Sequence, residues 1–361
     1  MPDARERRQG ELRRALADRG LGVLLVTSLP SIRYLTGFSG SGGMLIVAER
    51  ATVLVTDFRY ASQAPAEVGS SAEVQIEPKH VWGGVRATLA RLGARRVGIE
   101  RDQLTLAGVA ELEPLEGVEA VPVSGMVEAL REVKDETEIT ILREAARLAC
   151  DALDSILGFV RPGRTEYEVA AELEAALRRR GSEWFAFPTI VASGPRTALP
   201  HARCSGRAIE AGDWLLLDFG AQVDGYCSDI TRTYVVGAQP DGRQREVYEV
   251  VRRAQEVARR EIRPGQTGKE ADDLARDLIV QAGMGDRFGH SLGHGLGLEV
   301  HEGPRLSQRN ADPLPVGAVV TVEPGVYFEG WGGVRIEDDV VLRPDGAECL
   351  SDGRTELTAL S

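Results

Sequence analysis

The sequence predicts an α+β protein with a smaller N-terminal α/β domain and a larger C-terminal domain. The chain has 361 residues, which is more than one hydrophobic core usually fills. Segments with the apolar spacing of helices alternate with short β-branched runs along its whole length. The pattern changes near residues 124–137, so we expect one domain over residues 1–130 and a second over residues 138–361.

The first domain is expected to begin with a polar amphipathic helix over about residues 3–19, followed by the strand "GVLLVT". The segment "GGMLIVAERATVLVTD" predicts two strands joined by a turn at Glu49–Arg50. Helices are expected in "YASQAPAE" and "GGVRATLARLGARR", and a further strand in "RVGIE". This half concentrates no metal ligands and places no nucleophile beside a base, so we look for the chemistry in the second half.

The second domain begins with the helical pattern "KDETEITILREAARLACDALDSILGFV". A second helix is expected from an N-cap at Thr165, with Glu168 three residues on, to Gly181. Then "WLLLDFGAQVDGYCSDITRTYVVG" predicts strand, turn and strand, two more helices cover "EVYEVVRRAQEVARRE" and "GKEADDLARDLIVQAG", and strands follow in "AVVTVEPGVYF" and "GGVRIEDDVVL". An "RPG" break inside each helical pair hints at a duplication, with two helical pairs packed on one sheet.

Composition and charge exclude several classes of protein. The formal net charge of −12 argues against a general nucleic-acid binder, which needs a basic face. No apolar run has the length of a membrane span, and the charged N-terminus lacks the apolar core of a secretory signal. The four cysteines form no CxxC pair, which is typical of isolated thiols in a reducing compartment: Cys150, Cys204, Cys227 and Cys349. We therefore expect a cytoplasmic protein.

Histidines and carboxylates gather in unusual places in the second half. Three of the five histidines, His290, His294 and His301, lie in the glycine-rich segment "GHSLGHGLGLEVHEG". Four carboxylates lie beside apolar runs, where a charge is costly unless it is paired or bound to a metal. They are Asp218 after "WLLL", Asp229 eleven residues later, Glu323 after "VVTV" and Glu337 after "GVRI".

The charges of these groups suit a pair of metal ions. Four carboxylates balance two divalent cations, and a neutral imidazole completes the donor set. Oxygen and nitrogen donors without a thiolate favour Mn, Co, Fe or catalytic Zn, and two such ions are typical of hydrolases. On the pattern alone, scattered ion pairs with arginines remain an equal alternative.

Other known motifs partly match these segments, but each lacks a residue or a flanking segment that it requires. The segment "HSLGH" has the spacing of a zinc-protease helix without its glutamate, and "GHGLG" is not followed by the Lys-Ser/Thr of a phosphate loop. The "DFG" at residues 218–220 follows no HRD loop.

Longer stretches identify the family. In order and spacing, "LPHARCSGRAIEAGDWLLLDFGAQVDGYCSDITRTYVVG", "GHSLGHGLGLEVHEGP", "VVTVEPGVYF" and "GGVRIEDDVVL" resemble the pita-bread metallopeptidases, family M24, which includes methionine aminopeptidase, aminopeptidase P and prolidase. The stretches "SIRYLTGFSGS" and "LVTDFRYASQA" resemble the N-terminal domain of aminopeptidase P, prolidase and creatinase. The resemblance thus implies a C-terminal pita-bread fold, a creatinase-like N-terminal domain and the proline-specific branch.

The resemblance also implies roles for particular residues. Two divalent ions, Mn²⁺ before Co²⁺, Zn²⁺ or Fe²⁺, would activate a bridging hydroxide, with Glu323 as the proton shuttle. His201 and His301 would stabilise the tetrahedral intermediate and protonate the leaving imino nitrogen. The five ligands would be Asp218, Asp229, His294, Glu323 and Glu337, of which Asp229 and Glu337 bridge both ions, and the substrate would contact His290, Arg305, Tyr327 and Arg335.

The glycines around His294 are expected to let the backbone approach the metals. His80 lies outside every motif and is expected to have no part in the site.

For the activity, we favour an Xaa-Pro aminopeptidase acting on small proline-containing peptides as a homodimer. The N-terminal stretches favour this reading, whereas Arg305 lies where some prolidases bind a substrate carboxylate and favours an Xaa-Pro dipeptidase. A non-catalytic peptide-binding module on the same fold is the alternative from another class. Hydrolysis of organophosphate esters would be a side activity of the same metal pair.

Overall fold

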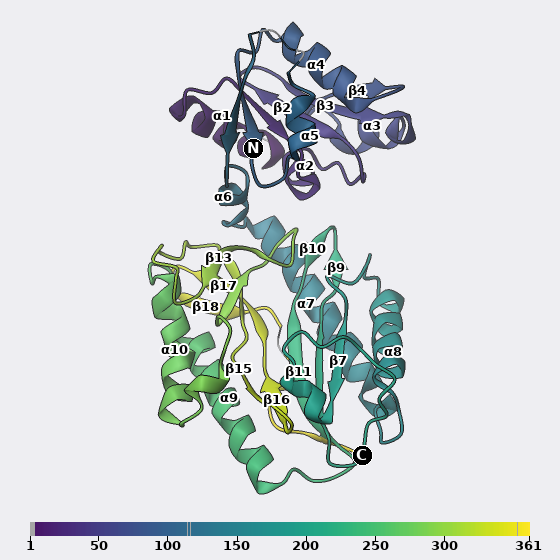
Figure 1. Ribbon diagram of the computed structural model, residues 1–361, viewed down its shortest axis with the longest axis vertical. Coiled ribbons are helices and arrows are strands. Elements are labelled where there is room, and N and C mark those ends of the chain that lie inside the picture. Colours follow the sequence, from purple (N-terminus) through teal and green to yellow (C-terminus); the bar gives the residue numbers. More distant parts are fainter. Residues whose placement is uncertain (1–3, 114, 116, 352) are drawn as a thin grey trace. The chain divides into compact units, whose positions relative to one another are not determined.

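The computed structural model describes residues 4–113, 115, 117–351 and 353–361. The chain divides into two compact units, Met1–Arg131 and Glu132–Ser361 (Figure 1). Within the described ranges, no helix combines the length and the apolar character that a membrane crossing requires.

The N-terminal unit is built on a mixed sheet of six strands in the order β4-β3-β2-β1-β5-β6. The strands are β1 (Val23–Val26), β2 (Met44–Ala48), β3 (Thr52–Asp57), β4 (Glu73–Glu77), β5 (Arg96–Glu100) and β6 (Glu119–Val123). The expected hairpin is confirmed, because β2 pairs antiparallel with β3 and Glu49–Arg50 lie in the connection. Strand β5 runs parallel to both β1 and β6. Parallel neighbours need a long crossover connection, and helices lie in the connections between these strands.

Helices cover this sheet and complete its core. They are α1 (Ala4–Asp18), α2 (Leu29–Thr36), α3 (Gln63–Val68), α4 (Val81–Arg91), α5 (Leu106–Ala110) and α6 (Glu128–Arg131). The helix expected over residues 3–19 is therefore present as α1, although residue 3 lies outside the described residues. In the stretch expected as one helix, "YASQAPAE", a 3-10 turn at Phe58–Tyr60 precedes the short α3.

The C-terminal unit holds two larger sheets. One has the order β19-β11-β8-β7, from β7 (Ile190–Ser193), β8 (Trp214–Phe219), β11 (Ile230–Val236) and β19 (Ala359–Leu360). The other has the order β13-β12-β14-β17-β18, from β12 (Gly293–Gly295), β13 (Glu302–Leu306), β14 (Val319–Val322), β17 (Asp338–Arg343) and β18 (Gly346–Cys349). Two hairpins accompany them, β9 (Gln222–Val223) with β10 (Tyr226–Cys227) and β15 (Gly325–Phe328) with β16 (Gly332–Arg335).

Four long helices flank these strands in two pairs, α7 (Glu136–Ile156) with α8 (Glu166–Arg179) and α9 (Gly242–Glu261) with α10 (Gly268–Gln281) (Figure 1). Each helix begins with a capping box. In this motif the N-cap side chain and the side chain three residues on each accept a hydrogen bond from the other residue's backbone N–H. The N-cap at Thr165 with Glu168 is as expected from the sequence.

The expectation of one sheet beneath the two helical pairs is wrong. The four-stranded and five-stranded sheets share no ladder. Where they meet, the hydroxyl of Thr233 donates to the carbonyl of Arg335 and the N–H of Glu337 donates to the carbonyl of Thr231. The side chains of Thr233 and Arg335 also bond across this junction, Thr233 to the main chain of Arg335 and Arg335 to the hydroxyl of Thr231.

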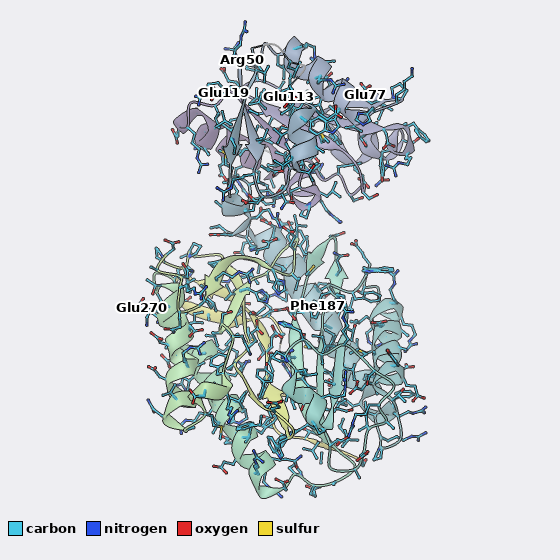
Figure 2. The ribbon with its side chains drawn as sticks, viewed as in Figure 1. Arg50, Glu77, Glu113, Glu119, Phe187 and Glu270 are labelled. Carbon is cyan, nitrogen blue, oxygen red and sulfur yellow. The ribbon has the colours of Figure 1, made fainter. Side chains whose placement is uncertain are left out.

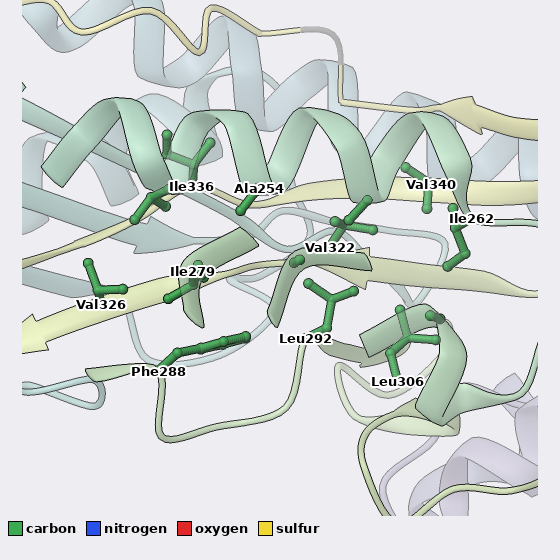
Figure 3. Close-up of a cluster of buried hydrophobic side chains, with 14 of the residues drawn as sticks. Ala254, Ile262, Ile279, Phe288, Leu292, Leu306, Val322, Val326, Ile336 and Val340 are labelled. Atoms are coloured by element: carbon green, nitrogen blue, oxygen red, sulfur yellow. The ribbon is translucent and has the colours of Figure 1, made fainter. Parts of the chain in front are cut away.

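Each sheet packs against its own helical pair. Figure 3 shows the core on one side, where Ala254 of α9 and Ile279 of α10 lie against Val322, Val326 and Val340 of the strands. A second cluster joins α7 and α8 to β8 and β11. The two clusters therefore hold the strand ends that carry the buried acidic side chains.

Candidate active site

Every residue that the sequence put forward for the site lines one cavity of about 260 Å³ in the C-terminal unit. The acidic and histidine candidates come from strands or strand ends: Asp218 in β8, Asp229 before β11, His294 in β12, Glu323 after β14 and Glu337 between β16 and β17. Apolar side chains complete the wall, among them Phe187, which Figure 2 labels in the middle of the unit. His80 is exposed on the N-terminal unit and does not line the cavity.

His294 faces the carboxylates with the ring atom that a metal would bind. Its Nδ1 lies 3.0 Å from the carbonyl oxygen of Gly295, which can only accept a hydrogen bond. Its Nε2 lies 3.4 Å from Oε1 of Glu323 and 3.7 Å from Oδ2 of Asp229. Because burial lowers the pKa of His294 to about 3, the ring is neutral and Nε2 presents a lone pair to these oxygens.

The candidate carboxylates lie close to one another and to His294. Possible ligand atoms of Asp229, His294 and Glu337 all lie within 4.8 Å of one another. Burial, and then the neighbouring carboxylates, raise the pKa of Asp229 and Glu337 well above its usual range, and burial raises the pKa of Glu323 to about 8. Oδ1 of Asp218 and Oδ1 of Asp229 are buried without a hydrogen-bond partner. Divalent cations between these oxygens would remove both the repulsion and the unmet bonding capacity.

A chain of hydrogen bonds runs behind the carboxylates. The guanidinium of Arg335 donates to Oδ2 of Asp218 over 2.5 Å and to the hydroxyl of Tyr327 over 2.8 Å. That hydroxyl lies 3.0 Å from Nε2 of His290. Arg335 is only 3% exposed, so its charge neutralises Asp218 and is already engaged within the protein.

Two threonines that sequence reasoning missed orient the candidate ligands. The hydroxyl of Thr231 donates to Oε2 of Glu337 over 2.6 Å and accepts from Nε of Arg335. The hydroxyl of Thr321 lies 3.3 Å from Oε1 of Glu323 and accepts from the N–H of His294. Thr321 is two residues from Glu323, and this period of two puts both side chains on one face of the strand, which was the available signal. Thr231 is two residues from Asp229 but bonds Glu337, so no spacing in the sequence indicated that contact.

The remaining candidates lie at the accessible side of the cavity. His201, His301 and Arg305 are exposed, and the rings of His301 and His294 pack edge to face with centroids 4.4 Å apart. Burial, and then the charge of Arg305, lower the pKa of His301. The guanidinium of Arg305 forms no ion pair or hydrogen bond with another residue in the part of the chain that the structure describes.

Two glycines of the histidine segment lie where neighbouring strands leave no room for a side chain. A Cβ at Gly293 would lie 2.0 Å from the carbonyl oxygen of Thr321, and one at Gly295 would lie 1.9 Å from that of Gly303. These glycines therefore let β12 approach its neighbouring strands closely, while a close approach of the backbone to the metals stays a prediction.

The comparison with protein families decides the family. Residues 140–344 match the model of metallopeptidase family M24, and residues 8–133 match that of the Creatinase/Prolidase N-terminal domain. The chain belongs to metallopeptidase family M24. The resemblance seen in the sequence and the two-part fold that it implied are thereby confirmed.

Relatives within the M24 family cover nearly the whole chain. An Xaa-Pro dipeptidase of Pyrococcus horikoshii is 38% identical over 93% of this chain and 94% of its own. The structure of an Xaa-Pro dipeptidase from Bacillus anthracis has a TM-score of 0.96 and 42% identity, covering 99% of this chain and 100% of that one. An X-Pro aminopeptidase from Thermotoga maritima has a TM-score of 0.90 and 37% identity, covering 97% and 99%.

Proposed function

We propose that this M24 metallopeptidase is an Xaa-Pro dipeptidase, which hydrolyses the bond before the proline of a dipeptide. The relatives named dipeptidases in the Pyrococcus and Bacillus comparisons support this alternative over the aminopeptidase that the sequence favoured. The observation that carries the proposal is Arg305. Its guanidinium lines the cavity of the candidate ligands and has no partner among the described residues, so it is available to a substrate carboxylate.

Two divalent ions fit the donor set, and Mn²⁺ is the first to test because the donors are oxygens and one imidazole. Asp218, Asp229, His294, Glu323 and Glu337 would hold them. When bound, the ions would lower the pKa of a water and polarise the scissile carbonyl.

The side chains around the ions would handle the protons. Glu323 would take the proton of the attacking water and return it to the leaving nitrogen. Burial lowers the pKa of His301, which favours the neutral ring, and a neutral ring can donate one hydrogen bond and accept another beside the reacting carbonyl. The bond before proline is a tertiary amide without an N–H, and its imino nitrogen must be protonated to leave.

The length of the substrate decides between the two activities. In a dipeptide the proline carries a free carboxylate, which would bind Arg305, whereas in a longer peptide that group is an amide. We expect hydrolysis of Xaa-Pro well above hydrolysis of Xaa-Pro-Yaa by the full chain, stripped of metal and reloaded with Mn²⁺.

The substitution Arg305→Gln tests the same point in the protein. Loss of a charge-assisted bond should raise KM for Xaa-Pro about 10- to 100-fold, with a smaller change in kcat. The matched control is Arg309→Gln, because Arg309 is exposed four residues away and does not line the cavity. An unchanged KM in the Arg305 variant would contradict the assignment.

The second candidate is an Xaa-Pro aminopeptidase, which the likeness to the Thermotoga protein favours. Faster cleavage of the tripeptide than of the dipeptide would establish it in place of the dipeptidase. Cleavage of neither peptide with any divalent metal would leave the peptide-binding module.

A further inference from the structure

The segment from Phe288 to Leu292, directly before β12, carries His290 but has no regular structure of its own. Residues 288–292 form neither helix nor strand, and the side chains at its two ends, Phe288 and Leu292, are buried in the core cluster drawn in Figure 3. The backbone polar groups between these anchors need partners elsewhere, because a buried N–H or C=O is costly when unpaired.

One ion pair on α10 supplies those partners. Nε and a terminal nitrogen of Arg276 donate to the carboxylate of Asp272 over 2.5 and 3.1 Å. The same guanidinium donates to the carbonyl of Phe288 over 3.0 Å and to that of His290 over 2.7 Å. Oδ1 of Asp272 accepts from the N–H of Leu292 over 2.8 Å. Asp272 is fully buried, so these bonds are shielded from water.

The clamped segment reaches the site by two routes. Through its ring, His290 contacts Tyr327, which is bonded to Arg335 and so to Asp218. Through its backbone, Leu292 accepts at its carbonyl from the N–H of Glu323 over 2.8 Å. Gln308, in the loop that follows Arg305, also donates to Asp272 over 2.8 Å.

We propose that Asp272 and Arg276 are positioning residues, which hold His290 at Tyr327 and thereby aim the Arg335–Asp218 pair at the metal site. This role rests on the proposed function only as far as its catalytic consequence is concerned. Neither residue lines the cavity, so the pair acts through the segment that it binds and not on the substrate.

The test compares Arg276→Gln and Arg276→Lys in the full, Mn²⁺-loaded chain. Lysine keeps a charge opposite Asp272 but cannot form the forked contacts to both carbonyls and the carboxylate. Because a misplacement of about 1 Å can cost about 100-fold, we expect kcat/KM to fall 10- to 100-fold in both variants. The control is Glu256→Gln, which removes an exposed pair with Arg252 on α9 and should leave kcat/KM unchanged.

A double-mutant cycle separates positioning from general destabilisation. In a His290→Gln background, Arg276→Gln should lower kcat/KM by less than it does in the unchanged chain, because the route through the His290 ring is already lost and only the backbone route through Leu292 remains. Equal losses in both backgrounds, or full activity in His290→Gln alone, would overturn the proposal.

A spectroscopic readout keeps the inference independent of the activity. The chain has five histidines, so labelling only Cε1 of each ring gives five NMR signals in the metal-free protein, and the one lost in His290→Gln belongs to that residue. We expect Arg276→Gln and Arg276→Lys to shift the His290 signal and leave that of His80 in place. An unmoved His290 signal would overturn the positioning role even if the chain cleaves proline peptides. A shifted signal in a chain that cleaves none would support positioning and refute the peptidase.

Discussion

Thr231 illustrates how one hydroxyl prepares a metal ligand. It donates to Glu337 and accepts from Arg335, so it fixes a carboxylate that burial alone would leave to repel its neighbours. Outer hydrogen bonds of this kind typically change metal affinity 10- to 100-fold.

We therefore predict that Thr231→Val weakens Mn²⁺ binding about 10- to 100-fold, measured by titration calorimetry. The matched control is Thr233→Val on the same strand, because Thr233 is also buried but its hydroxyl bonds only the main chain of Arg335. Equal losses of Mn²⁺ affinity in the two variants would mean that the strand, and not the carboxylate contact, was disturbed.

The acidic candidates make the stability of the protein depend on both pH and metal. Burial raises the pKa of Glu323 from 4.5 to about 8 in the metal-free fold, so the folded chain holds a proton that the unfolded chain releases. The free energy of unfolding of the metal-free protein should therefore fall as pH rises from about 4.5 to about 8. Metal ions bind the deprotonated carboxylates, so the stabilisation that the metal ions add to the folded protein should grow over the same pH range.

The measurement is Tm with Mn²⁺ and with a chelator at several pH values. We expect the difference between the two Tm values to increase by several degrees from about pH 5.5 to about pH 8. A difference that is constant or that shrinks with rising pH would show that the carboxylates are ionised in the metal-free fold.

At the scale of elements, the approach of β12 to β14 decides where His294 lies. Gly293 faces the carbonyl of Thr321 so closely that no side chain fits between the strands. The same sequence motif contains Gly289, where an added Cβ would meet nothing within 4 Å.

We predict that Gly293→Ala displaces β12, lowers the free energy of unfolding by about 2 kcal/mol or more and weakens Mn²⁺ binding. Gly289→Ala should leave both within error. Chemical denaturation and calorimetry on the two variants make the comparison, and similar behaviour would refute the close-approach argument.

At the scale of the whole molecule, the two units have separate cores, and all the candidate ligands lie in the C-terminal one. A ligand that binds one folded unit stabilises that unit by mass action. We therefore predict two thermal transitions, of which Mn²⁺ raises only one.

The core variant Leu24→Ala identifies the other transition. Leu24 is fully buried in β1, so its truncation should cost the N-terminal unit about 2–5 kcal/mol and lower the transition that Mn²⁺ leaves in place. A single transition that moves with both metal and Leu24→Ala would mean that the units unfold together.

The sequence by itself determined the elements and the chemistry of the donors. Periodicity located the long helices and the hairpin of β2 and β3, because local apolar spacing and turn residues dictate them. Carboxylates beside apolar runs marked Asp218, Asp229, Glu323 and Glu337, because a buried charge needs a partner wherever the chain goes.

Only the tertiary structure decided which groups meet. The division into two sheets, the engagement of Arg335 by Asp218, and the clamp of Asp272 and Arg276 on the His290 segment all join residues far apart in the chain. Their geometry depends on how the layers pack, and a linear pattern does not encode the distance between side chains on different strands. The same reason explains why the glycines of the histidine segment could be noticed in the sequence but not understood until β12 was seen against β14.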